Sequence, residues 1–250
     1  MITLKNADQI ACMRQAGRIT GEAILKARDA IKPGVSTKHL DDIIRSYIEK
    51  CGAKPSFLGY GGFPGSACIS VNDQVIHGIP DKSKILSDGD IVKIDVGAFY
   101  RGFHGDSANT FAVGKIPEQT QKLIDVTKES FHQGVNAIKP DGRIGDIGYA
   151  VQTYAESFGY GVVRRYVGHG VGHNLHEDPE VPNYGKQGRG PRICVGMVIA
   201  IEPMINEGTP NVRELDDGWT VLTADGKLSA HYEHTVAITE NGVELLTLVE

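Results

Sequence analysis

The chain has 250 residues, and its 26 basic and 31 acidic side chains give a formal net charge of −5. Hydrophobic residues make up 40% and charged residues 23%, proportions typical of a globular protein with a sizeable core. The mild acidity argues against specific binding of nucleic acid, and no apolar run approaches the roughly 18 residues of a membrane-spanning helix. Four widely spaced cysteines and an N-terminus without a signal-peptide pattern favour free thiols in the cytoplasm.

Four helices are expected from apolar residues at helical spacing, from capping residues and from proline or glycine stops. Asn6 is the expected N-cap of the first helix, and Thr37 that of the second. The expected helical ranges are 7–31, 37–52, 117–138 and 144–158. Strands are predicted at 67–71, 91–96, 103–113, 162–167, 197–205 and 231–239, with an additional strand within 219–223.

An internal repeat relates the two parts of the chain, with an offset of 107 residues that carries Ile31 to Ile138. The segment 89–95 falls without a gap on the segment 196–202. Such self-similarity indicates a duplicated unit of two helices and a sheet, and a chance match of two helix–strand units is the alternative. We expect a single catalytic domain, residues 1–250, made of two related halves of about 1–115 and 116–250 whose sheets join into one curved sheet.

The repeat places Asp95 and Glu202 at equivalent positions, each interrupting an apolar strand. A buried carboxylate without a partner is strongly unfavourable, so each needs a cation or a raised pKa. A structural ion pair with Lys93 or an arginine is one alternative. Asp106 and Asp95 flank a predicted hairpin turn at Tyr100-Arg101-Gly102 and are expected to face each other, and Glu233 to pair in the same way with the strand of Glu202.

His169 completes this set in the sequence Gly168-His169-Gly170, where flanking glycines allow close backbone approach. A structural histidine is the alternative, and a phosphate-binding loop is a weak one because no Lys-Ser/Thr pair follows. Two aspartates, two glutamates and one histidine form an oxygen-rich ligand set, with more negative charge than one divalent ion offsets. The set therefore predicts two bridged metal ions, as in aminopeptidases, phosphatases and nucleases.

Six motifs in chain order resemble the type I methionine aminopeptidases of the short bacterial form, in peptidase family M24. The motifs are VNDQVIHGIP (71–80), KIDVG (93–97), HGDSA (104–108), GHGVG (168–172), IEPM (201–204) and YEHT (232–235). The resemblance implies an α+β pita-bread (creatinase/aminopeptidase) fold, a curved antiparallel sheet with outer helices and internal pseudo-twofold symmetry. It also implies removal of the N-terminal initiator methionine from nascent proteins, preferentially when the second residue is small.

The resemblance further implies roles for individual residues. Two divalent ions (Co, Mn, Fe or Zn) would be held by five side chains, and water bound to them would attack the scissile carbonyl group. Glu202 would both bind metal and move protons, His176 would stabilise the oxyanion, and His77 would bond near the scissile nitrogen. The implied metal ligands are Asp95, Asp106, His169, Glu202 and Glu233.

An apolar pocket for the methionine side chain is also implied by the resemblance, and ordinary core packing is the alternative for each of its residues. Its candidates are Tyr60, Phe63, Cys68 and Trp219, with Phe57 and Leu175 at its edge. A monovalent cation bound by backbone carbonyl groups near Asn72, Gln74 and Ser229 is a further family feature. We regard the remaining histidines that we considered as structural: His39, His132, His173, His231 and His234.

The expected partners are the N-terminal methionine of nascent polypeptides and, transiently, the ribosome, with the protein acting as a monomer away from membranes. Three other classes are weighed against this interpretation. Prolidase-like enzymes share the fold but carry a further N-terminal domain, for which little room precedes Asp95. A binding module that has lost catalysis would not need all five ligands, and a phosphoesterase would need cationic phosphate clamps beside the metals.

Overall fold

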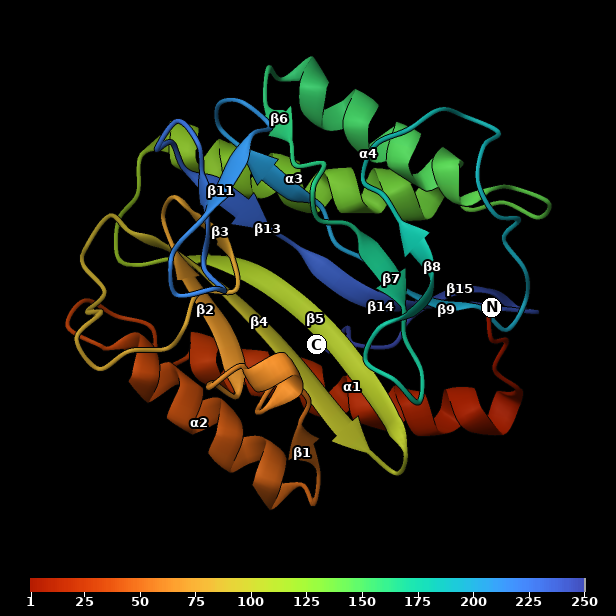
Figure 1. Ribbon diagram of the computed structural model, residues 1–250, viewed down its shortest axis with the longest axis horizontal. Helices are drawn as coiled ribbons and strands as arrows, with labels where there is room; N and C mark the ends of the chain where they lie inside the picture. Colours follow the sequence, from red (N-terminus) through yellow and green to blue (C-terminus); the bar gives the residue numbers. More distant parts are fainter. Residues whose placement is uncertain (250) are drawn as a thin grey trace.

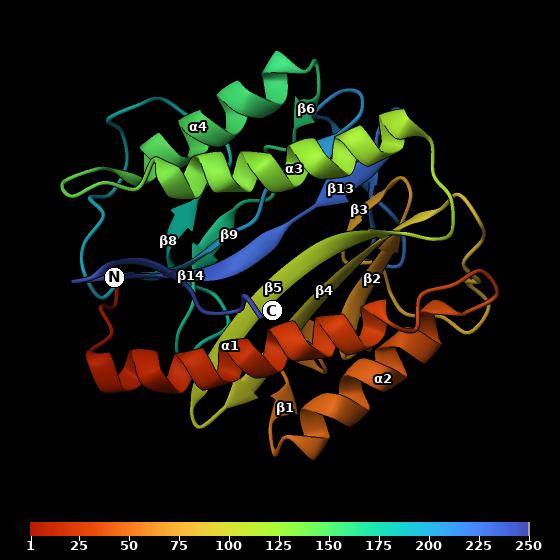
Figure 2. The same ribbon diagram turned by 180° about the vertical axis from the view of Figure 1, so that it is seen from behind.

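Four helices form two packed pairs on one side of a large sheet (Figures 1 and 2). The computed structural model describes residues 1–249. Helix α1 packs on α2, and α3 on α4. The helices are α1 (Ala7–Arg28), α2 (Thr37–Lys50), α3 (Glu118–Asn136) and α4 (Ile144–Ser157), with one short 3-10 turn, η1 (Tyr60–Gly62). Among residues 1–249, none of the helices combines the length and the apolar character that crossing a membrane requires.

The starts of the first two helices follow from their capping residues. Asn6 accepts a hydrogen bond from the Gln9 backbone N–H, and the Gln9 side chain accepts one from the Asn6 N–H, which is a complete capping box. The sequence predicted Thr37 as the N-cap of α2, and this is wrong by one residue, because the cap is Ser36. The Ser36 hydroxyl accepts from the His39 N–H, whereas the Thr37 hydroxyl donates to the Asp81 carbonyl oxygen and so holds a distant loop.

The large sheet has nine strands and is antiparallel throughout. Its main path runs β1-β4-β5-β14-β9-β7-β8, while β2 pairs with β4 and β15 pairs with β14. Its strands are β1 (Lys54–Pro55), β2 (Ala67–Val71), β4 (Ile91–Tyr100), β5 (Phe103–Ala112), β7 (Gly168–Gly170), β8 (Glu177–Val181), β9 (Val198–Ile201), β14 (Glu233–Thr239) and β15 (Gly242–Leu245).

Two three-stranded sheets lie beside the large one, with the orders β13-β10-β6 and β11-β12-β3. Their strands are β3 (Gln74–Ile76), β6 (Gly161–Val162), β10 (Met204–Asn206), β11 (Val212–Glu214), β12 (Val221–Thr223) and β13 (Ser229–His231). The strand predicted at 162–167 is therefore wrong beyond Val162, and the one within 219–223 begins only at Val221.

Two predicted long strands are each divided between a large and a small sheet. The run 197–205 breaks at Glu202-Pro203 into β9 and β10, because proline has no N–H to donate to a ladder. The run 231–239 breaks at Tyr232 into β13 and β14, and the Tyr232 N–H donates to the Pro203 carbonyl oxygen. Both strands thus leave the large sheet at the same place, and this place lies beside two of the predicted metal ligands.

The core is divided between the two helix pairs. One cluster packs α1 and α2 against β2 and β4, around residues such as Ile44 and Ile94. A second packs α3 and α4 against β9 and β14, around Phe131 and Ile199. The bounds of α4 are those of α2 displaced by 107 residues at each end, which is the offset of the sequence repeat.

Candidate metal centre and active site

Four carboxylates approach one another because antiparallel pairing aligns their strands. Asp95 on β4 lies opposite Ala108 on β5, and Ala108 lies opposite Glu233 on β14. Glu202 follows β9 directly, one step beyond the last ladder pair between β9 and β14. Two strands, β4 and β14, and the end of β9 therefore bring acidic side chains to one row across the sheet, with the small Ala108 side chain of β5 between Asp95 and Glu233.

The prediction that Asp95 and Asp106 face each other is wrong by two residues. The turn of the hairpin consists of Arg101 and Gly102 alone, both at positive φ (50° and 86°), so that Gly97 is the partner of Asp106. The two aspartates remain on the same face of the sheet as diagonal neighbours. Side chains at this separation are close enough to bind a common ligand between them.

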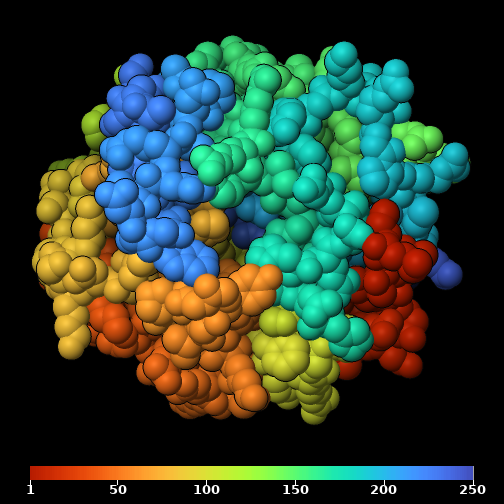
Figure 3. Space-filling model, viewed as in Figure 1, coloured from red at the N-terminus to blue at the C-terminus, as the bar shows by residue number. Residues whose placement is uncertain are grey.

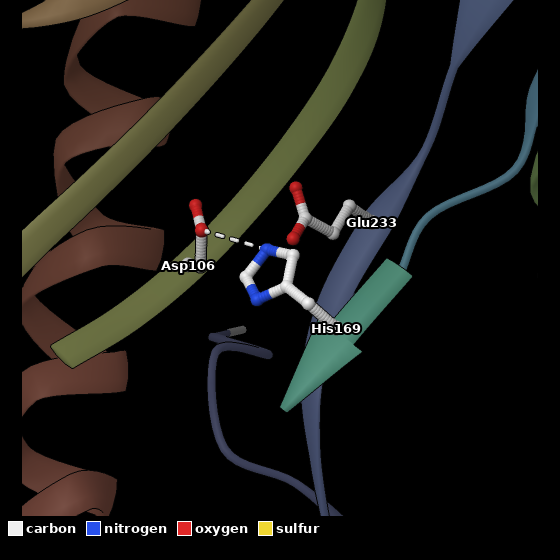
Figure 4. Close-up of side chains that lie close together, drawn as sticks. All are labelled: Asp106, His169 and Glu233. Atoms are coloured by element: carbon white, nitrogen blue, oxygen red, sulfur yellow. Dashed lines mark ion pairs between the residues drawn. The ribbon is translucent and has the colours of Figure 1, made fainter. Parts of the chain in front are cut away.

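His169 reaches this row from β7. Its Nε2 lies 3.7 Å from Asp106 Oδ2 and 3.6 Å from Glu202 Oε1, and its Nδ1 lies 2.9 Å from the Gly170 carbonyl oxygen (Figure 4). Because a carbonyl oxygen only accepts, Nδ1 carries the proton and Nε2 presents a lone pair to the carboxylates. A Cβ atom at Gly168 or Gly170 would lie 2.3 Å from a carbonyl oxygen of β9 or β8, so these glycines let the strand enter the sheet.

The site is short of positive charge. Burial and neighbouring carboxylates raise the pKa values of Asp95, Glu202 and Glu233 well above their usual range, and burial raises that of Asp106 to about 7. Burial lowers the pKa of His169 to about 3, so the ring is neutral at pH 7. Within residues 1–249 no lysine or arginine forms an ion pair with any of these carboxylates, which removes the alternative of a structural ion pair.

The donor set fits divalent metal ions. Among the described residues, the buried oxygens of Asp95 (Oδ1), Asp106 (Oδ1) and Glu233 (Oε1) have no hydrogen-bond partner. One ligand atom from each of Asp106, His169 and Glu233 lies within 4.8 Å of the other two, and Figure 4 shows the three side chains converging. Cations between these atoms would satisfy the orphaned oxygens and the imidazole lone pair at once.

A cavity of about 260 Å³ opens over the carboxylates, and Figure 3 shows the hollow at the centre of that face. Its lining contains every metal, catalytic and pocket residue that the sequence suggested. These are Phe57, Tyr60, Phe63, Cys68, His77, Asp95, Asp106, His169, Leu175, His176, Glu202, Trp219 and Glu233.

One end of the cavity is apolar. A buried cluster, which we call the apolar pocket, consists of Phe57, Phe63, Cys68 and Leu175, with Trp219 packed against it. The Phe63 and Trp219 rings meet edge to face at 5.1 Å between centroids. Such a pocket next to a polar centre can hold an unbranched apolar side chain, including a thioether.

Two further histidines lie between the apolar pocket and the carboxylates. The Tyr60 hydroxyl lies 2.7 Å from His176 Nδ1, and the His176 ring contacts that of His169 in a tilted arrangement, with 4.2 Å between centroids. His77 has a left-handed backbone (φ 58°) and packs edge to face against Trp219. Burial lowers the pKa of both histidines, that of His77 to about 4, so both are neutral donors or acceptors at pH 7.

His231 belongs near this site, although we regarded it as structural from the sequence. It is buried, neither ring nitrogen has a hydrogen-bond partner within residues 1–249, and its Nε2 lies 3.8 Å from Glu202 Oε2. The signal that could have found it is its spacing two residues before Glu233, but Tyr232 breaks the strand there and weakens any inference from alternation.

Comparisons with known proteins agree with this geometry. The profile of metallopeptidase family M24 matches residues 11–240. The chain is 56% identical to a methionine aminopeptidase of Clostridium acetobutylicum, over 100% of both chains. A crystal structure of a methionine aminopeptidase from Thermotoga maritima, 44% identical, superposes with a TM-score of 0.98 and 100% coverage of both chains.

A prolidase from Pyrococcus furiosus shares the architecture at a greater distance. It is 26% identical with a TM-score of 0.79, and the match covers 99% of this chain but 66% of the prolidase. The pita-bread fold expected from the resemblance is therefore confirmed, with its curved antiparallel sheet and outer helices. The protein is a member of metallopeptidase family M24 and, within it, belongs to the methionine aminopeptidases.

Proposed function

We propose that the protein is a metal-dependent aminopeptidase that removes the N-terminal methionine from new polypeptides, preferentially when the second residue is small. The observation that carries this proposal is the arrangement of one cavity. Its polar end holds four carboxylates and His169, and its apolar end is the pocket of Phe57, Phe63, Cys68 and Leu175. The names of the relatives point to the same activity.

The metal ions would be held by the two aspartates, the two glutamates and His169. In this proposal Asp95, Asp106, His169 and Glu233 would hold the ions together with Glu202, the fifth ligand. The bound divalent ions, for which Co, Mn, Fe and Zn are the candidates, would polarise the scissile carbonyl group and activate a water molecule. The donor set of oxygens and one imidazole supports hard or borderline ions.

The remaining steps belong to side chains of the chain itself. Glu202 would accept the proton of the attacking water and pass it to the leaving amine. The Tyr60 hydroxyl, donating to His176 Nδ1, would leave the proton of that ring on Nε2, where it can stabilise the developing oxyanion. His77 would bond near the scissile nitrogen, and its lowered pKa makes it a neutral partner for the peptide group.

The organisation of the chain and its surroundings are proposals as well. We propose one catalytic domain of two related halves, about 1–115 and 116–250, which the common offset of α2 and α4 supports. We also propose that the protein acts as a monomer in the cytoplasm, on nascent chains and in transient contact with the ribosome.

One set of assays separates this function from its rivals. The protein loaded with Co, Mn, Fe or Zn is offered Met-Ala-Ser, Met-Lys-Ser, a peptide beginning X-Pro and a phosphoester. Cleavage of Met-Ala-Ser alone is the expected result. Cleavage of the X-Pro peptide instead would indicate a prolidase-like enzyme, phosphoester hydrolysis would indicate a phosphoesterase, and no turnover with any of the four metals would refute the proposal.

A further inference from the structure

A buried lysine contacts two of the three backbone carbonyl groups near which the family resemblance implies a monovalent cation. Lys93 lies on β4, two residues before Asp95, and its side chain is 1% exposed. Its Nζ lies 2.6 Å from the Asn72 carbonyl oxygen and 2.9 Å from the Ser229 carbonyl oxygen. The ammonium group therefore joins the turn between β2 and β3 to the start of β13.

The Asn72 carbonyl oxygen is turned toward this point by its own surroundings. Asn72 has a left-handed backbone (φ 53°), and its side chain is fixed at both ends, accepting from the Ile91 N–H and donating to Asp90 Oδ1. The same Asn72 oxygen also accepts from the Ser229 N–H at 3.2 Å. The Asn72 and Ser229 carbonyl oxygens thus converge on one point, where both accept from the Lys93 ammonium group.

An ammonium group and an alkali-metal ion would compete for this place. Both are compact single positive charges, and both bind carbonyl oxygens. The Gln74 side-chain oxygen is not free to bind a cation at this point, since Oε1 accepts a hydrogen bond from the Val71 N–H at 2.8 Å. A second cation on the Asn72 and Ser229 oxygens would lie against Nζ, where two like charges repel strongly away from water.

We infer that the ammonium group of Lys93 replaces the monovalent cation at these carbonyl groups, so that the fold requires no sodium or potassium ion there. The charge is part of the polypeptide and is present at any salt composition. The contact joins β4, which carries Asp95, to β13, which leads into Glu233, and it fixes the turn that precedes His77. The lysine is a positioning residue for these strands, not a catalytic one.

The test is thermal unfolding of the Co²⁺-loaded protein in sodium, potassium and choline chloride at one ionic strength. Burial lowers the pKa of Lys93 to about 7, with Asp73 and Asp90 favouring the charged form, so the scans are run near pH 6, where the ammonium form predominates. The wild type is expected to have the same Tm in all three salts, within about 1 °C.

Two variants complete the experiment. Lys93→Ser leaves space and should lose about 5–10 °C in choline and regain at least half of this loss in sodium or potassium. Lys93→Met fills the space without charge and should lose a similar amount with no recovery in any salt. Anomalous scattering from crystals grown with rubidium should show an ion between the Asn72 and Ser229 oxygens in Lys93→Ser and none in the wild type.

Either of two results would overturn the inference. One is a rubidium peak at these oxygens in the wild type, or a wild-type Tm that rises in potassium as much as that of Lys93→Ser. The other is a folded Lys93→Ser protein with neither salt-specific recovery nor a bound rubidium ion. Should the serine variant not fold in any salt, the wild-type crystals and scans still decide, and the unfolding readout is independent of peptidase activity.

Discussion

The carboxylate cluster should make the metal-free protein less stable as the pH rises, and replacing one carboxylate should remove part of that cost. Asp106→Asn is the most informative change. Asp106 is 3% exposed, its Oδ1 has no hydrogen-bond partner in the described part of the chain, and its Oδ2 lies 3.7 Å from His169 Nε2. An asparagine has the same shape, carries no charge and can donate to the imidazole lone pair.

The magnitude follows from the pKa of Asp106, which burial raises from 3.8 to about 7. Below both values the carboxyl group is protonated in the folded and unfolded states and costs nothing. Between them the unfolded chain loses the proton and the folded chain keeps it, so the wild type loses about 1.4 kcal/mol per pH unit relative to the variant. Above pH 7 the difference levels off, after about three units, at roughly 4 kcal/mol.

The assay is urea unfolding of both proteins, with metal removed by a chelator, at about pH 5, 6, 7 and 8. Buried histidines such as His77 and His231 have lowered pKa values and also change stability with pH, but they are common to both proteins and cancel in the difference. The free energy of unfolding of the variant should rise relative to that of the wild type from pH 5 to 7. With added Co²⁺ the wild type should be the more stable protein. A difference that is constant with pH, or that favours the wild type at pH 8 without metal, would show that burial does not raise the pKa of Asp106 in the folded protein.

Three further changes test the roles proposed above. Glu202→Gln at saturating metal should lower kcat by about 10²–10⁴-fold, measured by peptide hydrolysis, and an active variant would remove Glu202 from proton transfer. His176→Ala should lower kcat by about 10²–10³-fold with a smaller change in KM, and a change confined to KM would contradict an oxyanion contact. Gly97→Ala would place a Cβ atom 2.9 Å from Phe57 Cε1 and 2.7 Å from Ser56 Cβ, so Phe57 should be displaced in the apolar pocket and KM for Met-Ala-Ser, measured by peptide hydrolysis, should rise. A Gly97→Ala enzyme with wild-type KM would show that Phe57 does not shape the pocket.

Local features of the fold could be predicted because they depend on neighbours in the sequence. The Asn6 cap of α1 and the end of α2 depend on local signals. The ranges of α2 and α4 agree with the 107-residue offset of the repeat. The types of residue in the metal centre were also predictable, since a carboxylate inside an apolar strand such as Asp95 requires a compensating partner.

What depends on register or on distant contacts could not be predicted. The hairpin turn of two residues, in place of a centre nearer Tyr100, shifts the partner of Asp106 from Asp95 to Gly97. The breaks at Pro203 and Tyr232 depend on a second sheet to which the strands turn. The role of Lys93 depends on two carbonyl groups that lie 21 and 136 residues away along the chain.

The metal centre exists only where the two parts of the large sheet meet, and that junction is short. β5 and β14 share two ladder pairs, Glu233 with Ala108 and His234 with Ser107. Thr235 extends the junction by side-chain bonds: its hydroxyl donates to the Asp106 carbonyl oxygen at 2.8 Å and accepts from the Asp106 N–H at 2.9 Å. Ionised carboxylates would repel one another across this same seam, and metal ions held by ligands from both of its sides would strengthen it as they bind.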